Sequence, residues 1–317
     1  MKHRSIGHKR QKRKKVIRTA LLVCGVLLIV LFAAVFLLKG ERQPDSVIET
    51  SSPAASQTLL PSTTLTLTPT PVPTLTTDPE FTPTPEPSPE PCFLESLDGY
   101  APGDVIENEL IDTANLGMYF TINEISEGDG IYQRIYGQSY VENPDISIDE
   151  LRYIKLLHVN FDGNYQVGEL IVNASVASQV TEIFEQLCEA GYEIYSMYLI
   201  DDFWVGNGTD SDTNSIDHNN TSCFCYRPAS GSSHISLHAL GLAIDLNPQQ
   251  NPYVRVQGDG SLSYSHENAS DYVENRSSDI PHVITEEDYA YRLFAEAGWT
   301  WGGSWSNPID YQHFQLG

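Results

Sequence analysis

One stretch of the sequence decides both the fold and the chemistry to expect: Ser236-Leu-His238-Ala-Leu-Gly241-Leu-Ala243-Ile-Asp245-Leu-Asn247-Pro248. From position 241 to 246, large aliphatic residues alternate with small or acidic ones, which predicts a strand with one apolar face. Asp245 lies on the opposite face among small residues, so there is open space above its carboxylate. His238, seven residues earlier, can fold back over that space from the preceding turn. The stretch therefore predicts a strand end where an imidazole and a carboxylate meet.

A histidine nitrogen and a carboxylate oxygen are ligands that suit zinc. The alternative is a solvent-facing strand end where His238 and Asp245 only form hydrogen bonds. A further candidate ligand lies in Asp310-Tyr-Gln-His313-Phe-Gln315, where an acid and a histidine stand three residues apart between aromatic residues. Together with His313, the first two would leave a fourth metal position open beside Asp310, as in a catalytic zinc site. For this segment the alternative is a terminal strand with its histidine in the core.

The sequence around these motifs alternates between strand-like and helix-like stretches. Hydrophobic periodicity predicts strands over residues 153–161, 168–172 and 192–200, and helices over 176–187 and 290–297. Strands and helices do not alternate with the regularity that would indicate a parallel sheet. We therefore expect an α+β fold, a single compact domain with an antiparallel sheet.

The charges divide the chain into two different parts. The 317 residues include 18 Lys+Arg and 42 Asp+Glu, for a net charge of -24, and nine of the basic residues lie in the first 18 positions. From position 43 onward, seven basic residues face 41 acidic ones. Because this acidic part of the chain repels phosphate backbones, we expect no binding to nucleic acid.

The basic residues precede a candidate membrane segment. Residues 20–38 are apolar apart from Cys24 and Gly25, and as a helix they would span roughly 29 Å. We predict a basic cytoplasmic head at 1–18 and an uncleaved transmembrane signal anchor at 19–39, because the flanking cations place the N-terminus inside. The protein would then sit in the cell membrane as a single-pass protein, with its catalytic domain extracytoplasmic. A cleaved signal peptide is the alternative, although no typical cleavage site follows Leu38.

A proline-rich segment follows the apolar run. Residues 43–91 contain 12 of the 19 prolines and almost no aromatic residue that could nucleate a core. We predict a disordered Pro/Thr/Ser-rich linker at 40–91, which in polyproline II conformation would reach roughly 150 Å. Residues 92–317 remain as the extracytoplasmic domain. Its four cysteines (Cys92, Cys188, Cys223 and Cys225) are expected to form structural disulfides in that compartment, with their pairing left open.

Several catalytic classes are excluded by missing motifs. A serine D,D-peptidase needs S-x-x-K, but Lys155 is the only lysine after Lys39, Arg152 stands three residues before it, and K-T-G is absent. There is no H-E-x-x-H helix, no G-x-S-x-G elbow and no P-loop. Cys223 and Cys225 could act as nucleophiles, but nothing else in the sequence supports cysteine catalysis.

The remaining motifs resemble one family. The pattern S-x-H-x-x-G-x-A-x-D, followed by [DE]-x-x-H, resembles the zinc D-alanyl-D-alanine carboxypeptidases (VanY-like), a family that includes vancomycin-resistance dipeptidases and phage L-alanyl-D-glutamate peptidases. The likeness covers roughly residues 119–317 and leaves 92–118 outside it. Further stretches read as blocks of the family: 134–140, 161–163, 168–173, 219–222, 226–227, 251–254 and 297–303.

The resemblance implies a role for each matching residue. Zinc would be bound by His238, Asp245 and His313, and Asp310 would be the general base toward the zinc-bound water. Arg227 would be catalytic and substrate-binding, because a guanidinium can pair with a substrate carboxylate or stabilise an oxyanion. Ser236 would support the substrate. At Gln315 many relatives carry Glu, so a contact near the metal is expected to differ.

Other candidates are weaker. We expect His234 to be a surface residue or a neighbour of the site, because the preceding Gly-Ser-Ser disfavours the helix that a metal pair with His238 would need. Three tryptophans (Trp299, Trp301 and Trp305) fit a cleft wall or the core equally well. The stretch 210–214 begins like a calcium loop, but the sixth and twelfth positions lack the required Gly and Glu.

The resemblance implies a zinc metallopeptidase that hydrolyses peptidoglycan stem peptides, most simply as a D,D-carboxypeptidase, and the apolar segment predicts that it is membrane-anchored. An L-alanyl-D-glutamate endopeptidase is the alternative within the family, since specificity depends on the cleft walls. A non-catalytic wall-binding module that uses the same pocket is a third reading. The sequence leaves the oligomeric state open.

Overall fold

The computed structural model describes residues 92–317 except 230, 233, 267–268 and 275. The predicted basic head, transmembrane anchor and linker all lie outside these residues. Within the described part of the chain, no helix has the length and apolar character needed to cross a membrane.

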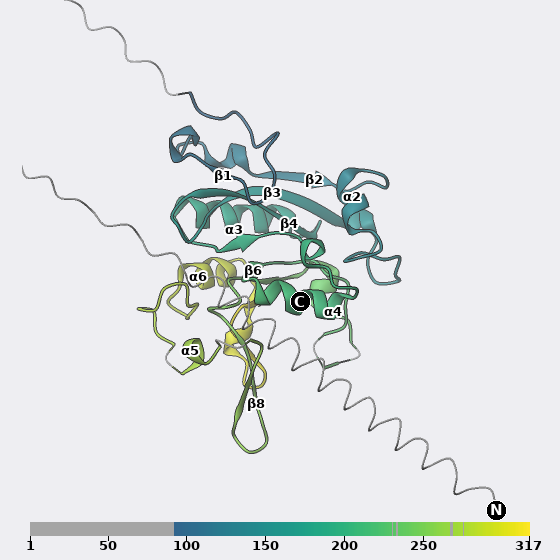
Figure 1. Ribbon diagram of the computed structural model, residues 1–317, viewed down its shortest axis with the longest axis vertical. Coiled ribbons are helices and arrows are strands. Elements are labelled where there is room, and N and C mark those ends of the chain that lie inside the picture. Colours follow the sequence, from purple (N-terminus) through teal and green to yellow (C-terminus); the bar gives the residue numbers. More distant parts are fainter. Residues whose placement is uncertain (1–91, 230, 233, 267–268, 275) are drawn as a thin grey trace, which may run out of the picture. The chain divides into compact units, whose positions relative to one another are not determined.

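The first half of the domain is built on a four-stranded antiparallel sheet with the order β1-β4-β3-β2. The strands are β1 (Val105–Ile106), β2 (Thr121–Glu124), β3 (Leu151–Val159) and β4 (Tyr165–Asn173). Helix α3 (Ala177–Glu189) packs along this sheet (Figure 1). The two long strands and the helix agree with the sequence prediction. Gly191, with φ 67°, lies just beyond the end of α3.

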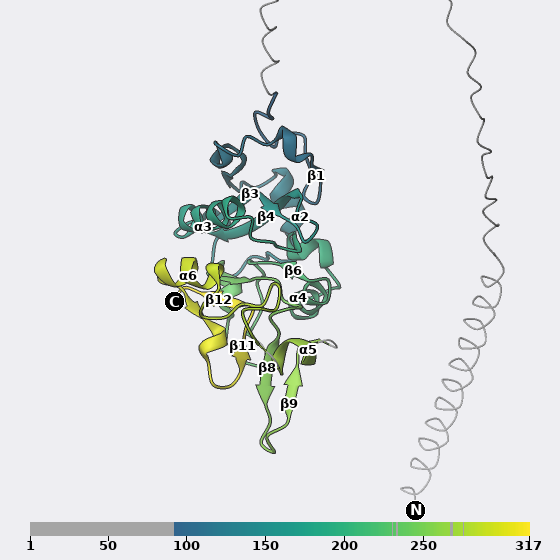
Figure 2. The ribbon, with the colours of Figure 1, turned by 90° about the vertical axis from the view of Figure 1, so that its left-hand side faces the viewer.

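The second half contains two three-stranded antiparallel sheets. One has the order β10-β12-β7, formed by β7 (Ala243–Asp245), β10 (Thr300–Trp301) and β12 (His313–Gln315). The other has the order β11-β8-β9, formed by β8 (Tyr253–Val256), β9 (Leu262–Tyr264) and β11 (Ile309–Asp310). Figure 2 shows the β8–β9 hairpin extending away from the rest of the domain.

The remaining elements are short. The α-helices are α2 (Gly130–Ile135), α4 (Gly208–Asp217), α5 (Ser270–Val273) and α6 (Tyr289–Glu296). The 3-10 helices are η1 (Asn108–Leu110), η2 (Leu116–Tyr119), η3 (Ile148–Glu150), η4 (Ile200–Phe203), η5 (Leu237–Leu240) and η6 (Gly302–Ser304). Helix α6 confirms the predicted helix near the end of the chain; its N-cap is Asp288, whose side chain accepts from Ala290 N.

The α+β class is confirmed, but the prediction of one antiparallel sheet is too simple. A fourth sheet pairs β5 (Ser196–Met197) with β6 (Asn220–Thr221) in parallel. The predicted strand at 192–200 therefore shrinks to two residues. The amides of Tyr195 and Tyr198 donate to the side-chain oxygens of Asn247 and Asn220, so amide side chains take the place of a neighbouring strand.

Two apolar clusters hold these layers together. The larger joins the first sheet, α3 and α6 to the strands of the second half, and Phe294 of α6 stacks on Phe314 of β12 at 4.3 Å. The smaller lies around α2 and one end of β3. Trp299 and Trp301 belong to the larger cluster, so two of the three candidate cleft tryptophans are core residues. Each buried indole N–H donates to a neighbour, to Gln179 Oε1 and Tyr311 O respectively.

The expected disulfides are not formed, because all four cysteines of the described part are free. Cys188 and Cys223 are buried in the larger core, Cys225 is buried with its sulfur 3.7 Å from Gly208 O, and Cys92 is exposed. Burial raises the pKa of Cys188 to about 12, and it also raises the pKa of the thiols of Cys223 and Cys225. These cysteines are therefore protonated core residues, which also argues against cysteine catalysis.

Candidate functional site

Two strands, β7 and β12, and one short helix, η5, bring the predicted ligands together. His313 pairs directly with Asp245 across the β12–β7 ladder, so their side chains lie on the same face of the sheet. His238 stands on η5, which ends at Gly241 immediately before β7. A Cβ at Gly241 would lie 2.5 Å from Asn173 N, and its φ is 66°. Glycine at this position therefore lets the chain turn back tightly against β4 and place His238 over β7.

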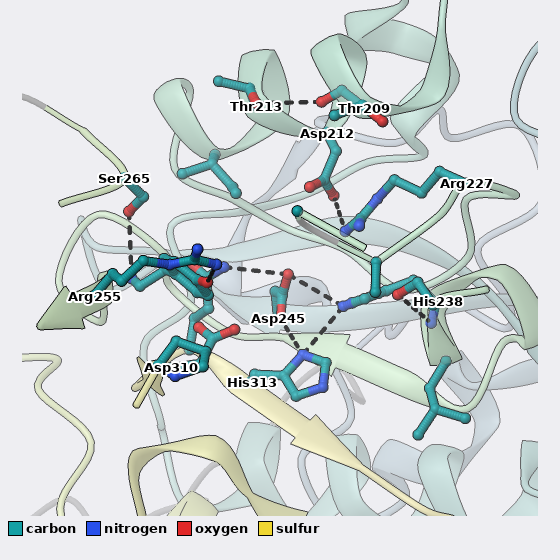
Figure 3. Close-up of a pocket in the computed structure, with 18 of the residues that line it drawn as sticks. Thr209, Asp212, Thr213, Arg227, His238, Asp245, Arg255, Ser265, Asp310 and His313 are labelled. Carbon is teal, nitrogen blue, oxygen red and sulfur yellow. Dashed lines mark hydrogen bonds and ion pairs between the residues drawn. The ribbon is translucent and has the colours of Figure 1, made fainter. Parts of the chain in front are cut away.

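The three side chains converge on one point (Figure 3). His238 Nε2 lies 3.2 Å from His313 Nδ1 and 3.3 Å from Asp245 Oδ2, while His313 Nδ1 lies 2.9 Å from Asp245 Oδ1. One donor atom from each residue lies within 4.8 Å of the others, and all three residues are buried. The sequence motifs therefore predicted a real cluster of side chains from segments up to 75 residues apart.

The outer nitrogens of both histidines are fixed by hydrogen bonds. His238 Nδ1 lies 2.6 Å from Cys223 O, and His313 Nε2 lies 2.9 Å from Gln315 Oε1. Because a carbonyl oxygen only accepts, each of these ring nitrogens carries the proton. In the neutral imidazoles the lone pairs of His238 Nε2 and His313 Nδ1 then face each other and the carboxylate of Asp245.

This arrangement fits a zinc ion. Three lone-pair donors that face one another in a buried place repel unless a cation lies between them. Two nitrogens bound to one tetrahedral zinc at about 2.0–2.1 Å are about 3.3–3.4 Å apart, close to the 3.2 Å found here. Two imidazoles and one carboxylate are also a donor set that zinc accepts, with a fourth position left for water or substrate.

The charges of the cluster point the same way. Although burial opposes ionisation of Asp245, the two histidines hold the pKa of its carboxyl well below its usual range. Burial lowers the pKa of His238, but Asp245 more than offsets it, so the pKa of the imidazole is raised. A buried carboxylate that stays ionised beside two imidazoles favours a cation in the centre, a proton or a metal.

Asp310 stands beside this cluster on β11. It is buried, and its Oδ1 has no hydrogen-bond partner among the described residues. Burial raises the pKa of Asp310 to about 7, with the nearby carboxylates of Asp245 and Asp212 adding to the effect and His313 opposing it. A carboxyl group with such a pKa and a free oxygen is suited to take and return a proton near neutral pH.

In Figure 3, Arg227 and Asp310 lie on opposite sides of Asp245. The guanidinium of Arg227 pairs with Asp212 of α4 at 2.8 Å, and its buried Nε has no partner in the described part of the chain. The Asp212 contact was not predicted from the sequence, because nothing in the helix pattern marks this acid. The unused N–H leaves one donor for a substrate oxygen.

Ser236 has a structural contact as well as a place in the site. Its hydroxyl accepts from His238 N at 3.3 Å and so caps η5, the short helix that carries the first ligand. The side chain also lines the cavity. Its contact with a substrate stays a prediction.

A cavity of ≈ 790 Å³ is lined by the three candidate ligands and by Asp310. Its walls come from α4, from the loop that contains Gly231, and from the β8–β9 hairpin through Tyr253, Arg255 and Ser263. Trp305 also lines it, unlike the two core tryptophans. Gln312, likewise in the wall, donates to Asp245 Oδ2 at 3.3 Å. Sequence reasoning missed Arg255 and Gln312; the scarcity of cations after position 43 was the one signal that could have marked Arg255.

The weaker candidates stay outside the site. His234 is exposed and is not part of the metal-ligand cluster, as expected. Residues 210–214 lie within helix α4 and form no calcium loop.

A buried His-Asp-His cluster with a free carboxyl group beside it, at the floor of a cavity, is the donor set of single-metal hydrolases. Comparison with protein families gives the particular class: residues 230–316 match the family of D-alanyl-D-alanine carboxypeptidases. The family resemblance of the motifs is thereby confirmed for residues 230–316. The match includes the three candidate ligands and Asp310, and it begins after Arg227. No curated protein and no solved structure matches the chain.

Proposed function

We propose that the protein is a membrane-anchored, zinc-dependent D,D-carboxypeptidase that removes the terminal D-alanine from peptidoglycan stem peptides. The observation that carries this proposal is the buried cluster of His238 Nε2, His313 Nδ1 and Asp245 beside the partnerless Oδ1 of Asp310. The match of residues 230–316 to the carboxypeptidase family supports the choice of substrate. A non-catalytic wall-binding module has no need of the free carboxyl group.

The two histidines and Asp245 would hold the zinc ion, which supplies Lewis acidity to activate a water and to polarise the scissile carbonyl. The chain's own residues do the rest. Asp310, with its carboxylate ionised, accepts the proton of the attacking water, and its protonated form then donates it to the leaving amine. In the metal-free chain burial raises the pKa of Asp310 to about 7, and this burial favours return of the proton from the carboxyl group to the leaving amine.

Arg227 binds the negative charge of the substrate. Asp212 holds the guanidinium from one side, so the side chain loses less entropy when its free Nε–H binds the substrate. It donates either to the terminal carboxylate of the peptide or to the oxyanion that develops at the scissile carbonyl. Ser236, at the rim of η5, contributes a hydroxyl to the same wall.

The proposed location rests on the sequence. The predicted anchor at 19–39 would hold the chain in the membrane with its basic head inside, and the segment at 40–91 would carry the peptidase into the cell wall. Such a tether suits a substrate that lies at some distance from the membrane.

The decisive experiment uses the full-length protein with zinc and a defined stem pentapeptide, with products identified by mass spectrometry. We expect the loss of one terminal alanine, abolished by a chelator and by His238→Ala. Asp310→Asn should retain zinc but lose about 10²–10⁴-fold in rate. An internal cut before D-glutamate would assign the chain to the endopeptidase branch. An intact peptide despite stoichiometric zinc would reject the enzymatic proposal in favour of a binding module.

A further inference from the structure

The cavity contains two arginines in very different situations. Arg227 is buried and neutralised by Asp212 at 2.8 Å. Arg255 is exposed on β8, and its Nη2 donates to the uncharged hydroxyl of Tyr253 at 2.7 Å. Among the described residues it forms no ion pair with a carboxylate. Within the described part of the chain, Arg255 thus lines the cavity of an acidic domain with only the Tyr253 hydroxyl as its side-chain partner. Its charge is therefore available to an anion bound in the cavity.

The hairpin presents Arg255 to the cavity. Arg255 pairs with Ser263 across the β8–β9 ladder, so both side chains lie on the same face, and both line the cavity together with Tyr253. Tyr253 in turn pairs with Asp310 across the β8–β11 ladder. The strand that carries the guanidinium is therefore hydrogen-bonded directly to the strand that carries the proposed base.

The guanidinium also reaches the opposite rim. A Cβ built at Gly231 would lie 3.5 Å from Arg255 Nη2, so the arginine extends from the hairpin to the loop that leads into η5. In Figure 3, Arg255 and Arg227 lie on opposite sides of Asp245. A peptide bound across the ligands would therefore meet one arginine at each end.

The charges lining the cavity favour an anionic peptide. Three carboxylates (Asp212, Asp245 and Asp310) and the two arginines line it. With a divalent ion in the centre, the positive charges exceed the negative ones by one when all three carboxylates are ionised. A substrate with a terminal carboxylate at Arg227 leaves Arg255 free for a second negative group.

We propose that Arg255 is a specificity-determining residue that binds an internal carboxylate of the substrate, on the N-terminal side of the scissile bond. This inference rests on the proposed peptidase function and names its substrate class: peptides that carry a free second carboxylate. In a stem peptide that group is the α-carboxylate of the D-glutamyl residue or the carboxylate of a diamino acid in the third position. Tyr253 positions the guanidinium through its hydroxyl.

The test compares matched peptides on the full-length zinc protein: one with both internal carboxylates free, one with the D-glutamyl carboxylate amidated and one with the diamino-acid carboxylate amidated. Arg255→Gln should lower kcat/KM about tenfold for the free peptide, the loss expected for one charge-assisted hydrogen bond at a partly exposed site. Amidation of the recognised carboxylate should cost the wild type the same factor and cost Arg255→Gln nothing further. The peptide whose amidation has this effect identifies the group that is bound.

Arg292→Gln is the matched control. Arg292 is also exposed and also lies over a tyrosine ring, Tyr289 at 5.5 Å against 5.8 Å for Arg255 over Tyr253, but it does not line the cavity. Arg292→Gln removes the same charge from the same domain but outside the cavity. The kcat/KM of this variant should therefore match that of the wild type for every peptide. Tyr253→Phe should show a smaller loss than Arg255→Gln, confined to the peptides with the recognised carboxylate free.

A binding measurement separates this inference from the proposed function. Calorimetry on Asp310→Asn, with and without Arg255→Gln, measures the affinity for the same three peptides without turnover. Should no peptide be hydrolysed while the Arg255-dependent preference persists, the peptidase proposal fails and the carboxylate site stands. An equal effect of Arg255→Gln on free and amidated peptides, no effect on any of them, or an equal effect of Arg292→Gln would overturn the carboxylate site.

Discussion

Single hydrogen bonds decide which ring nitrogen of each histidine is available at the centre of the site. Gln315 Oε1 holds the proton on His313 Nε2, and Cys223 O does the same for His238 Nδ1. The resemblance to the carboxypeptidase family predicts a glutamate at position 315, where this chain has glutamine. The structure gives its consequence: the amide still fixes the tautomer, but it adds no negative charge behind the imidazole.

Replacement of Gln315 should therefore change the affinity for the metal more than it changes the stability of the fold. Gln315→Ala is expected to weaken zinc binding about 10–100-fold, the usual effect of removing a partner of a ligating histidine. Gln315→Glu should strengthen binding, because a carboxylate makes the imidazole a better donor. Competition with a chromophoric chelator measures both. Gln257→Ala, an exposed glutamine on the hairpin, is the control, and an equal loss in that variant would contradict the assignment.

Asp310 makes a second prediction, on the pH dependence of stability without metal. Its pKa is raised from 3.8 to about 7 by burial, so the folded state binds its proton more tightly than the unfolded state does. The resulting stabilisation is complete below pH 3.8 and is lost as the pH rises through 7. Asp310→Asn removes this loss. Its stability relative to the wild type should increase between pH 5 and pH 8, by up to a few kcal/mol.

Chelator-treated protein, unfolded by urea at the two pH values, provides the measurement. Addition of zinc should shrink the difference between Asp310→Asn and the wild type, because a cation in the centre stabilises the ionised carboxylate. A difference that is the same at both pH values would mean that Asp310 is not protonated in the metal-free fold.

At the scale of elements, the turn from η5 into β7 places the first ligand. Gly241 has φ 66°, and a Cβ there would lie 2.5 Å from Asn173 N. Gly163, in the turn between β3 and β4, has φ 76° and nothing within 4 Å of an added Cβ. Substitution of Gly163 therefore measures the cost of the left-handed conformation alone, and substitution of Gly241 adds the cost of the close approach to Asn173.

Gly163→Ala should destabilise the fold by about 1 kcal/mol, the cost of a left-handed conformation for alanine. Gly241→Ala should cost clearly more, because the backbone of β4 cannot yield easily, and it should also weaken zinc binding as η5 shifts away from β7. Chemical denaturation and the chelator competition report the two effects. Equal losses of stability in the two variants would show that the close approach to Asn173 is relaxed at little cost.

At the scale of the whole molecule, a bound metal would link segments that are distant in the chain. Its ligands come from η5, β7 and β12, and Phe314 beside His313 belongs to the larger core. At a zinc concentration of 100 times Kd, the stabilisation is about 2.7 kcal/mol. For a domain of this size that corresponds to roughly 5–11 °C in Tm.

Thermal unfolding of the full-length protein with and without zinc measures this effect. His313→Ala should abolish most of the zinc-dependent shift, whereas exposed His234→Ala should preserve it. A zinc-dependent shift that survives His313→Ala would place the ion elsewhere.

The sequence predicted the centre of this molecule better than its edges. His238, Asp245 and His313 could be found because metal ligands are restricted to few residue types, and β3, β4 and α3 because they are long enough to show a period. The hairpin wall and the parallel β5–β6 pair could not, because strands of two to four residues carry too little pattern. Arg255 and Asp212 were missed because their roles depend on tertiary neighbours, and the free cysteines because pairing depends on distance in the fold.

The position of β12 in the chain determines when the site can be completed during synthesis. His313 completes the cluster only when the last strand of its sheet has been synthesised and has inserted beside β7. A nascent chain that has emerged up to β10 already holds His238 and Asp245, yet it lacks the third donor that would retain the metal. A metal bound by these three donors would thus be acquired late in biosynthesis, only after β12 has joined its sheet, and the proposed hydrolysis would have to wait for that step.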